Sequence, residues 1–375
     1  MDVFYDLKAN AGQAAGPDGV TYDDLSRREA ADLLRDLSRA VRNGAYRPGP
    51  GRRVSIAKPR GGYRTLTIRD VCYRVVSSAL NIGMTPVWEP CFVSWSMGFR
   101  PDRSVLHLLA ELEVVVTNQN RWVLAVDDIK KAFDNVPIDD VLADHRPYVR
   151  DPALLPLIEV VLRGGDDARA VGIDQGSAYS PTALNVRLHH AHDQHIDRCT
   201  VCPPRYRYAD NLVYACRSVS EGRQAMNRSK DLLENAGFTL KGEDGPPTDL
   251  REGHRIQLLG FSLYEQDGKL SYGLGEDAWN KLEQNLLKVH GADDPTDAAR
   301  SVVNGWIDAI GPAFESRRDV VLERVLTTAI GYGFREIDSK EFLLRRWGSS
   351  WGRWRRLRRD VRRQHHGGQR SEGVG

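Results

Sequence analysis

Two short apolar segments, each carrying an aspartate where a strand ends or turns, constrain the fold of this 375-residue chain more than any other feature. WVLAVDDI (122–129) is a nearly continuous apolar run of strand length that ends on two aspartates. RYRYADNLVYAC (205–216) predicts a strand, a turn and a second strand. A strand end and a hairpin tip both present side chains at the edge of a sheet. The sequence therefore predicts that Asp128 and Asp210 meet there.

Two adjacent carboxylates repel each other unless a cation lies between them. Oxygen ligands of this kind suit Mg²⁺, whose remaining positions are filled by water and substrate phosphates. Two such ions, about 3.5–4 Å apart, stabilise the attacking and leaving oxygens of a phosphoryl transfer. For either aspartate alone, an ordinary turn residue is the better interpretation. The metal hypothesis depends on the motifs that surround the pair.

The rest of the chain divides into a mixed part and a helical part, with the seam near residue 275. Periodicity and turn residues predict helices and hairpins in alternation before the seam, and helices alone after it. Helices are predicted at 23–45, 70–90, 103–117, 138–163, 180–197, 219–237 and from 276 onward, and hairpins at 52–68 and 256–274. Ser180 and Pro181 are expected to cap the fifth helix. The pattern is typical of an α+β catalytic domain with a helical appendage.

Composition favours an ordinary globular protein, with 41% hydrophobic and 28% charged residues. No stretch approaches the 18 apolar residues that a membrane span needs. The first ten residues lack a signal-peptide pattern, and five cysteines do not predict a disulfide framework, so the cytoplasm is the expected compartment.

Positive charge is unevenly distributed although the net charge is only +2. Basic residues are concentrated in 52–103, and residues 345–370 hold ten arginines against the single acidic residue Asp360. Two basic regions in a nearly neutral chain favour a polyanionic partner such as nucleic acid. Solvated arginine faces are the alternative.

A series of short motifs in a fixed order resembles the reverse transcriptases, especially the bacterial group II intron and retron-like kinds. The motifs span about residues 16–310, most of the chain. In order they are GPDGV (16–20), KPRGGYRTLTI (58–68), SMGFRPDRS (96–104), DDIKKAFDNV (127–136), GIDQGSAYSP (172–181), YADN (208–211), GFTL (237–240), LLGF (258–261) and VVNGW (302–306).

The resemblance implies a right-hand polymerase fold, with fingers and an antiparallel palm sheet in residues 1–275 and an all-helical thumb in 276–340. An Arg- and Trp-rich basic segment, 341–375, would follow, with its end disordered from about 367. It also implies an RNA-directed DNA polymerase that uses two Mg²⁺ ions, with Mn²⁺ as a substitute. The partners would be an RNA template, a DNA or RNA primer, dNTPs and, by analogy with free-standing bacterial relatives in phage defence, a cognate non-coding RNA.

Site residues follow from the matching motif positions. Asp128 rather than Asp127, together with Asp210, would bind the metals, and Asn211 completes the catalytic motif. The resemblance assigns the incoming nucleotide to Lys58, Arg64, Phe133 (the steric gate against a ribose 2′-hydroxyl), Gln175 and Gly176. It assigns template and duplex contacts to Arg100, Gly305 and Trp306, and the basic segment adds Arg353, Arg355 and Arg356.

Three positions depart from the family pattern and gather near the expected site. Asn211 replaces the second aspartate of YADD, which removes a charge and weakens metal binding. Asp174 replaces a proline, and Lys241 stands where the family has a Lys-Thr pair. These changes keep two alternatives open: an RNA-binding maturase or scaffold with reduced catalysis, and an untemplated or unusually primed polymerase.

Two weaker patterns remain. Cys199 and Cys202 follow four histidines, so a zinc site is conceivable, although surface histidines and two thiols are the preferred interpretation. Trp347, Trp351 and Trp354 recur at helical spacing among arginines. They could stack on bases or pack inside the helical region, and the sequence favours neither.

Overall fold

The computed structural model describes residues 1–10, 14–57, 63–242, 245–292 and 294–371. Its strands form a two-stranded, a four-stranded and a three-stranded sheet, and every strand pair is antiparallel. The strands are β1 (Arg52–Ala57), β2 (Tyr63–Ile68), β3 (Val123–Asp128), β4 (Arg205–Tyr208), β5 (Asn211–Cys216), β6 (Thr248–Asp249), β7 (Ile256–Leu258), β8 (Phe261–Gln266) and β9 (Lys269–Leu274).

Helices occupy most of the remaining described chain. Before the central sheet is complete they are α1 (Asp2–Asn10), α2 (Arg27–Arg42), α3 (Val71–Trp88), α4 (Val105–Asn118), η1 (Ala132–Asn135), α5 (Ile138–His145), α6 (Leu154–Arg163), α7 (Ser180–Leu188), the π-helical turn η2 (His189–Asp193), α8 (Gln194–Asp197), α9 (Val219–Asn235) and η3 (Leu250–Glu252). After it come α10 (Glu276–Lys288), η4 (Val289–Gly291), α11 (Pro295–Ile310), η5 (Gly311–Arg317), α12 (Arg318–Gly331) and α13 (Lys340–Ser371).

The central sheet has the strand order β4-β5-β3-β6. Its two long strands are buried because their side chains are apolar on both faces, including Val123, Leu124, Val213 and Ala215. Helices α4 and α9 pack against this sheet. This α+β arrangement, followed by a helical C-terminal region, confirms the predicted fold class.

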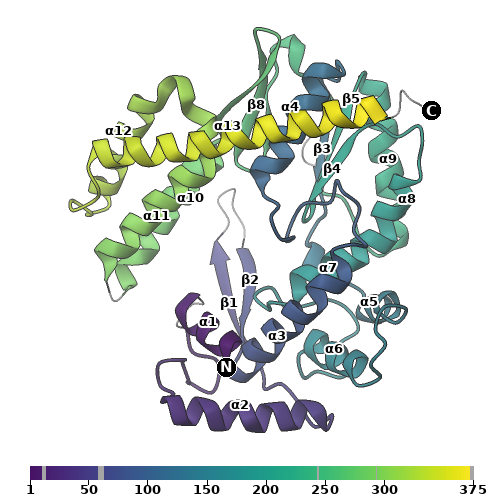
Figure 1. Ribbon diagram of the computed structural model, residues 1–375, viewed down its shortest axis with the longest axis vertical. Helices are drawn as coiled ribbons and strands as arrows, with labels where there is room; N and C mark the ends of the chain where they lie inside the picture. The colour runs from purple at the N-terminus through teal and green to yellow at the C-terminus, as the bar shows by residue number, and fades with distance from the viewer. Residues whose placement is uncertain (11–13, 58–62, 243–244, 293, 372–375) are drawn as a thin grey trace.

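A second core lies among α3, α5, α6 and α7, where Trp88 and Tyr179 are fully buried. Helix α2 begins with a capping box in which Ser26 and Glu29 bond each other's backbone. The hairpin β1–β2 belongs to neither larger sheet (Figure 1).

The helical region is joined to the rest of the molecule by its last helix. Figure 1 shows α13, in yellow, running across the molecule from the end near α12 to the side of the central sheet. It contacts α11 and α12 along one part and α4 along another. The division into fingers and palm, thumb and basic segment stays a prediction.

Some predicted elements differ in detail. Ser180 begins α7 rather than capping it, since Tyr179 is the N-cap and makes no capping bond. The predicted hairpin at 256–274 is a three-stranded meander. Helix α13 continues to Ser371, beyond the predicted start of disorder, and 372–375 lie outside the described residues. Among the helices described, none has the length and apolarity to cross a bilayer.

Candidate active site

Asp128 and Asp210 come together at one end of the central sheet, as the sequence predicts. Asp128 is the last residue of β3 and pairs in register with Asn211, the first residue of β5. Asp210 occupies the turn between β4 and β5, and its carbonyl accepts a hydrogen bond from the Ile129 amide at 2.9 Å. The two carboxylates therefore lie at the same edge of the sheet, Asp128 at the end of β3 and Asp210 just before the start of β5.

The electrostatics of the pair reflect burial and mutual repulsion, with Lys241 as the neighbouring cation. Burial, and then the charge of Asp128, raise the pKa of Asp210 above its usual range. Asp128 Oδ1 is buried and accepts no hydrogen bond from any described residue. A buried oxygen without a donor is costly, and a bound cation would satisfy it. The carboxylate oxygens of Asp128 and Asp210 therefore fit as ligands of a hard cation such as Mg²⁺.

Two neighbouring side chains modify this site. The Lys241 ammonium pairs with Asp128 Oδ2, and its backbone amide donates to the Asp128 carbonyl at 2.8 Å. The Asn211 amide donates to Asp210 Oδ1 at 3.2 Å, so it orients the carboxylate that it follows. The sequence left the role of Lys241 open, and the structure places it in direct contact with the proposed metal ligand.

Asp127 has a different role from Asp128. Its Oδ1 accepts the backbone amides of Asp128 at 2.8 Å and Gly242 at 3.1 Å. The side chain is buried, and its hydrogen bonds fix the end of β3 against the segment after Leu240. Within the described residues no cluster of three or more His, Cys, Asp or Glu side chains with metal-site geometry occurs. Water and phosphate oxygens would have to complete any coordination sphere.

An open cavity adjoins Asp128, between the central sheet and the helical region. Its wall is polar and basic on the sheet side and mixed on the side of α10 and α11. Asp210 does not line it. The residues that bear on function are Asp128, Lys130, Lys131, Lys241, Lys281, Gly305 and Trp306.

Phe133 lies in η1, just after Lys131, which adopts a left-handed backbone with φ 47°. Its ring is partly buried against the second core and stands edge-on to the ring of Phe99, with centroids 6.1 Å apart. Phe99 is largely exposed.

Gln175 and Gly176 form a loop that is attached to β2. The Thr67 amide donates to the Gln175 carbonyl at 2.8 Å. Gly176 has φ +109°, and a Cβ there would lie 3.0 Å from the Thr67 carbonyl oxygen, so only glycine fits without strain. Of the predicted triphosphate ligands, Lys58 lies outside the described residues. Arg64 stands on β2, and its side chain is outside the described part of the structure.

Asp174, whose purpose the sequence did not reveal, is a buried structural anion. Its Oδ2 accepts from Arg69 Nε at 2.8 Å, and its Oδ1 accepts from Arg169 at 2.7 Å. Arg69 also donates to the carbonyls of Gly49 and Gly164, each at 2.8 Å. The substitution for proline thus fixes the Gln175–Gly176 loop by a charge cluster.

Two residues predicted to contact nucleic acid are largely buried. Arg100 is 7% exposed, and its guanidinium is held by Glu89 at 2.7 Å and by the carbonyls of Val93 and Ser96. Trp306 is 8% exposed, and its indole N–H donates to the Ala278 carbonyl at 2.8 Å, while its side chain also lines the cavity beside Asp128. Their contacts with nucleic acid stay predictions. Gly305 has open space around its Cα.

In the basic C-terminal helix α13, the tryptophans pack against the rest of the protein and several arginines face solvent. Trp347 and Trp354 are buried and Trp351 is partly buried, so packing accounts for the tryptophan spacing. Arg353 is exposed and pairs with Asp308 at 2.7 Å, whereas Arg355 and Arg356 are exposed with no ion pair to a described residue.

The preferred interpretation of the histidines and cysteines is wrong. Cys199 and Cys202 are joined by a disulfide bond. His189 and His192 are buried, and each hydrogen-bonds a neighbouring polar side chain rather than a cysteine.

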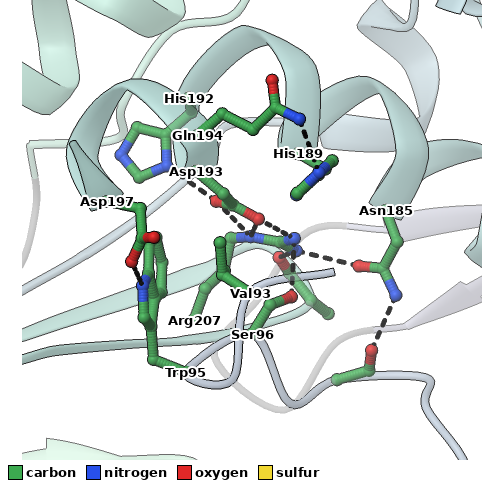
Figure 2. Close-up of polar contacts among 12 residues, drawn as sticks. Val93, Trp95, Ser96, Asn185, His189, His192, Asp193, Gln194, Asp197 and Arg207 are labelled. Carbon is green, nitrogen blue, oxygen red and sulfur yellow. Dashed lines mark hydrogen bonds and ion pairs between the residues drawn. The ribbon is translucent and has the colours of Figure 1, made fainter. Parts of the chain in front are cut away.

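Sequence reasoning missed a buried polar network beneath the aspartate turn, drawn in Figure 2. Arg207, on β4, forms an ion pair with Asp193 of the π-helical turn, and both side chains are completely buried. The available signal was the sequence of β4, RYRY, because a charge at a strand position that faces the core needs a buried partner.

Comparison with known proteins agrees with these features. The family model described as reverse transcriptase (RNA-dependent DNA polymerase) matches residues 56–243. Protein YkfC of Escherichia coli is 32% identical over 194 residues, covering 48% of this chain and 50% of that protein. The group II intron-encoded protein LtrA of Lactococcus lactis is 27% identical over 197 residues, covering 50% of this chain and 32% of that protein. This chain thus spans half or less of these relatives' lengths.

Among solved structures, telomerase from Candida albicans, in a complex with a fragment of telomeric RNA, gives a TM-score of 0.45 at 12% identity. The match covers 87% of this chain and 68% of that chain. Because the family model spans half of the sequence and includes both aspartates, the chain belongs to the reverse transcriptase family.

Proposed function

We propose that the chain is an RNA-directed DNA polymerase that extends a primer by two-metal nucleotidyl transfer. The observation that carries this proposal is the buried, unsatisfied Oδ1 of Asp128 near Asp210, which lies in the turn before the neighbouring strand β5. The cavity next to Asp128 is lined by Lys130, Lys131 and Lys281. Such a wall suits a polyanionic substrate that approaches a cation site.

Asp128 and Asp210 would hold the two Mg²⁺ ions, with Mn²⁺ as a substitute. When bound, these ions would lower the pKa of a primer 3′-hydroxyl and neutralise the charge of the leaving pyrophosphate. Asn211 would orient Asp210 through its amide hydrogen bond. Lys241 would stay beside Asp128 Oδ2, where its charge opposes that of a cation at Oδ1.

The protein would otherwise act by positioning its substrates. On the strength of the family resemblance, Phe133 would abut the ribose and select dNTPs, and Lys58 and Arg64 would hold the triphosphate. Gln175 and Gly176 would line the nucleotide pocket. Their loop is well placed for this because it is already bonded to β2.

RNA template and DNA or RNA primer would occupy the cavity beside Gly305, with Arg353, Arg355 and Arg356 offering positive charge outside it. Arg100 and Trp306 would support this path from inside the protein. A role in phage defence, with a cognate non-coding RNA, rests on analogy alone.

The test compares Asp128→Ala with the exposed α9 variant Asp231→Asn in primer extension on an RNA template. We expect Asp128→Ala to abolish Mg²⁺-dependent and Mn²⁺-dependent dNTP incorporation, and Asp231→Asn to leave it intact. Incorporation retained by Asp128→Ala would contradict the proposal.

A second function is favoured by Asn211 and by the contact between Lys241 and Asp128. Both reduce the negative charge available to metal, as expected of an RNA-binding maturase or scaffold with little catalysis. That function predicts tight RNA binding by the folded wild-type protein and no incorporation with either metal.

A further inference from the structure

Arg207 carries a charge at a position where no water reaches it. Its side chain and that of Asp193 are both 0% exposed. Nε of Arg207 donates to Asp193 Oδ1 at 3.0 Å, and Nη2 donates to Oδ2 at 2.5 Å. The pair links β4 to the π-helical turn η2, a type of helical irregularity that is frequent at functional sites.

Burial of an ion pair does not by itself explain the choice of these residues, because apolar side chains of similar volume are often at least as stabilising. Burial alone would raise the pKa of Asp193, but Arg207 and His192 hold it at about 2. The guanidinium of Arg207 is a rigid planar fork, so its two bonds to Asp193 fix the directions of its remaining donors.

Those donors point toward the turn that carries Asp210. Nη1 of Arg207 donates to the Ala209 carbonyl at 3.0 Å and to Asn185 Oδ1 at 2.9 Å. Nη2 also donates to Ser96 Oγ at 2.8 Å. Figure 2 shows the Arg207 side chain between those of Asp193, Asn185 and Ser96.

The turn itself is strained and needs support. Ala209 has φ +56°, a left-handed conformation that costs free energy for any residue with a Cβ. Two hydrogen bonds hold its consecutive carbonyls. One runs from Arg207 to Ala209, and the other from the Ile129 amide to Asp210. The position of Asp210 relative to β3 depends on both.

Asn185, on α7, supports the same turn from another direction. Its Oδ1 accepts from Arg207, and its amide group donates to the Gly98 carbonyl at 2.8 Å. Gly98 lies directly against the turn, since a Cβ there would be 2.1 Å from the Ala209 nitrogen. Asn185 thus holds Gly98 through its carbonyl, and Gly98 packs directly against Ala209 on the turn.

We infer that Arg207 is a positioning residue, which acts through the Ala209 carbonyl and with Asp193 as its counter-ion to hold Asp210 at the metal-binding edge of the sheet. This role rests on the proposed function, because Asp210 is taken as a metal ligand. Asn185 is the second positioning residue. The other end of the network does not touch the turn: His192 contacts Ser229 at 2.9 Å, and Ser229 contacts Tyr214 at 2.5 Å.

This geometry supplies the matched variants. Arg207→Lys keeps the charge but loses the guanidinium fork. Asn185→Ala removes the second support and leaves the ion pair in place, so it decides the question if Arg207→Lys fails to fold. Ser229→Ala disrupts the same buried network at the end far from the turn and serves as the control.

The first measurement is amide hydrogen exchange in peptides covering 205–213, without metal, on the full chain. We expect Arg207→Lys and Asn185→Ala to exchange faster there by about tenfold or more, as loss of a charged hydrogen bond implies. Ser229→Ala should leave this turn protected. Equal exchange in Asn185→Ala and Ser229→Ala would overturn the inference, whatever the catalytic activity.

The second measurement is Mn²⁺ binding, followed by the Mn²⁺ electron paramagnetic resonance signal. Asn185→Ala should bind Mn²⁺ more weakly than Ser229→Ala when each variant is measured the same number of degrees below its own melting temperature. Equal affinity of the two variants would contradict the inference. If Asp128→Ala binds Mn²⁺ as tightly as the wild type does, that result would instead contradict the proposed function. The hydrogen-exchange result would still decide the role of Arg207 at the turn.

Discussion

At the scale of single residues, two neighbours of the aspartates change the charge of the site: Asn211 is neutral and Lys241 is positive. Asn211 holds Asp210 by a 3.2 Å hydrogen bond where a second carboxylate would repel it. Lys241 brings a positive charge to Asp128. Asn211 and Lys241 both reduce the net negative charge around the two aspartates, which weakens their attraction for a metal ion. The same two residues thus tune metal affinity downward.

Replacing Asn211 by aspartate should reverse part of this effect. A unit charge about 4 Å from a cation contributes about 4 kcal/mol at an effective dielectric constant of 20, so a gain of about tenfold in Mg²⁺ affinity is a modest expectation. The measurement is the Mg²⁺ concentration for half-maximal incorporation, with Asn211→Ala alongside. An Asn211→Asp enzyme that needs as much Mg²⁺ as the wild type would show that the amide is not the limiting feature.

At the scale of elements, buried polar side chains fasten helices and loops around the second core. His145 of α5 is fully buried, with Nε2 2.5 Å from the Tyr179 hydroxyl at the start of α7 and Nδ1 2.6 Å from the Val141 carbonyl. Burial is the main cause that lowers the pKa of His145 to about 4, and the charge of nearby His190 adds to it. The folded protein therefore holds a neutral imidazole at this junction.

This histidine predicts a loss of stability in mild acid. The pKa of His145 is lower in the folded state than the usual 6.5, so the unfolded chain binds the proton first. The contribution of His145 to the free energy of unfolding should fall by about 1.4 kcal/mol per pH unit below 6.5 until pH reaches about 4. Denaturant unfolding at several pH values checks this, and His145→Gln should show a shallower slope. Parallel slopes for the two proteins would contradict it.

Elements were predicted from sequence better than the contacts between them. The apolar run at 122–129 predicted β3, the pattern of residues 205–216 predicted the β4–β5 hairpin, and the aspartates at their ends predicted the candidate site, because these patterns are local. Asp174 was puzzling in the sequence because its partner Arg69 lies 105 residues away. The burial of Arg100 and Trp306 was equally hidden, since only packing shows that an arginine or tryptophan is buried.

At the scale of the whole molecule, α13 ties the helical region to the side of the central sheet (Figure 1). The tie is centred on Glu113 of α4, which is 4% exposed. It accepts hydrogen bonds from Arg358 at 3.1 Å and Arg362 at 2.6 Å, and from the Tyr272 hydroxyl at 3.0 Å. The cavity beside Asp128 is lined by residues of both parts that α13 connects.

Glu113→Gln should loosen this connection without touching the aspartates. Loss of the charged hydrogen bonds should cost about 1–3 kcal/mol of unfolding free energy. Amide exchange in α13 should rise, and primer extension products should shorten because the duplex is held less firmly. Asp231→Asn, on the exposed face of α9 and away from α13, is the control. Full-length products together with unchanged exchange in α13 would argue against the connection.

The tie between α4 and α13 also has a consequence for the order of folding. Arg358 and Glu113 are 245 residues apart in sequence, so this contact closes a very large loop of chain. Contacts between distant segments form late, because the entropy of loop closure is lost before the contact repays it. We therefore expect the sheet and its aspartates to assemble before the helical region docks against α4. The wall of the cavity that α10 and α11 provide would then take its final position late in folding.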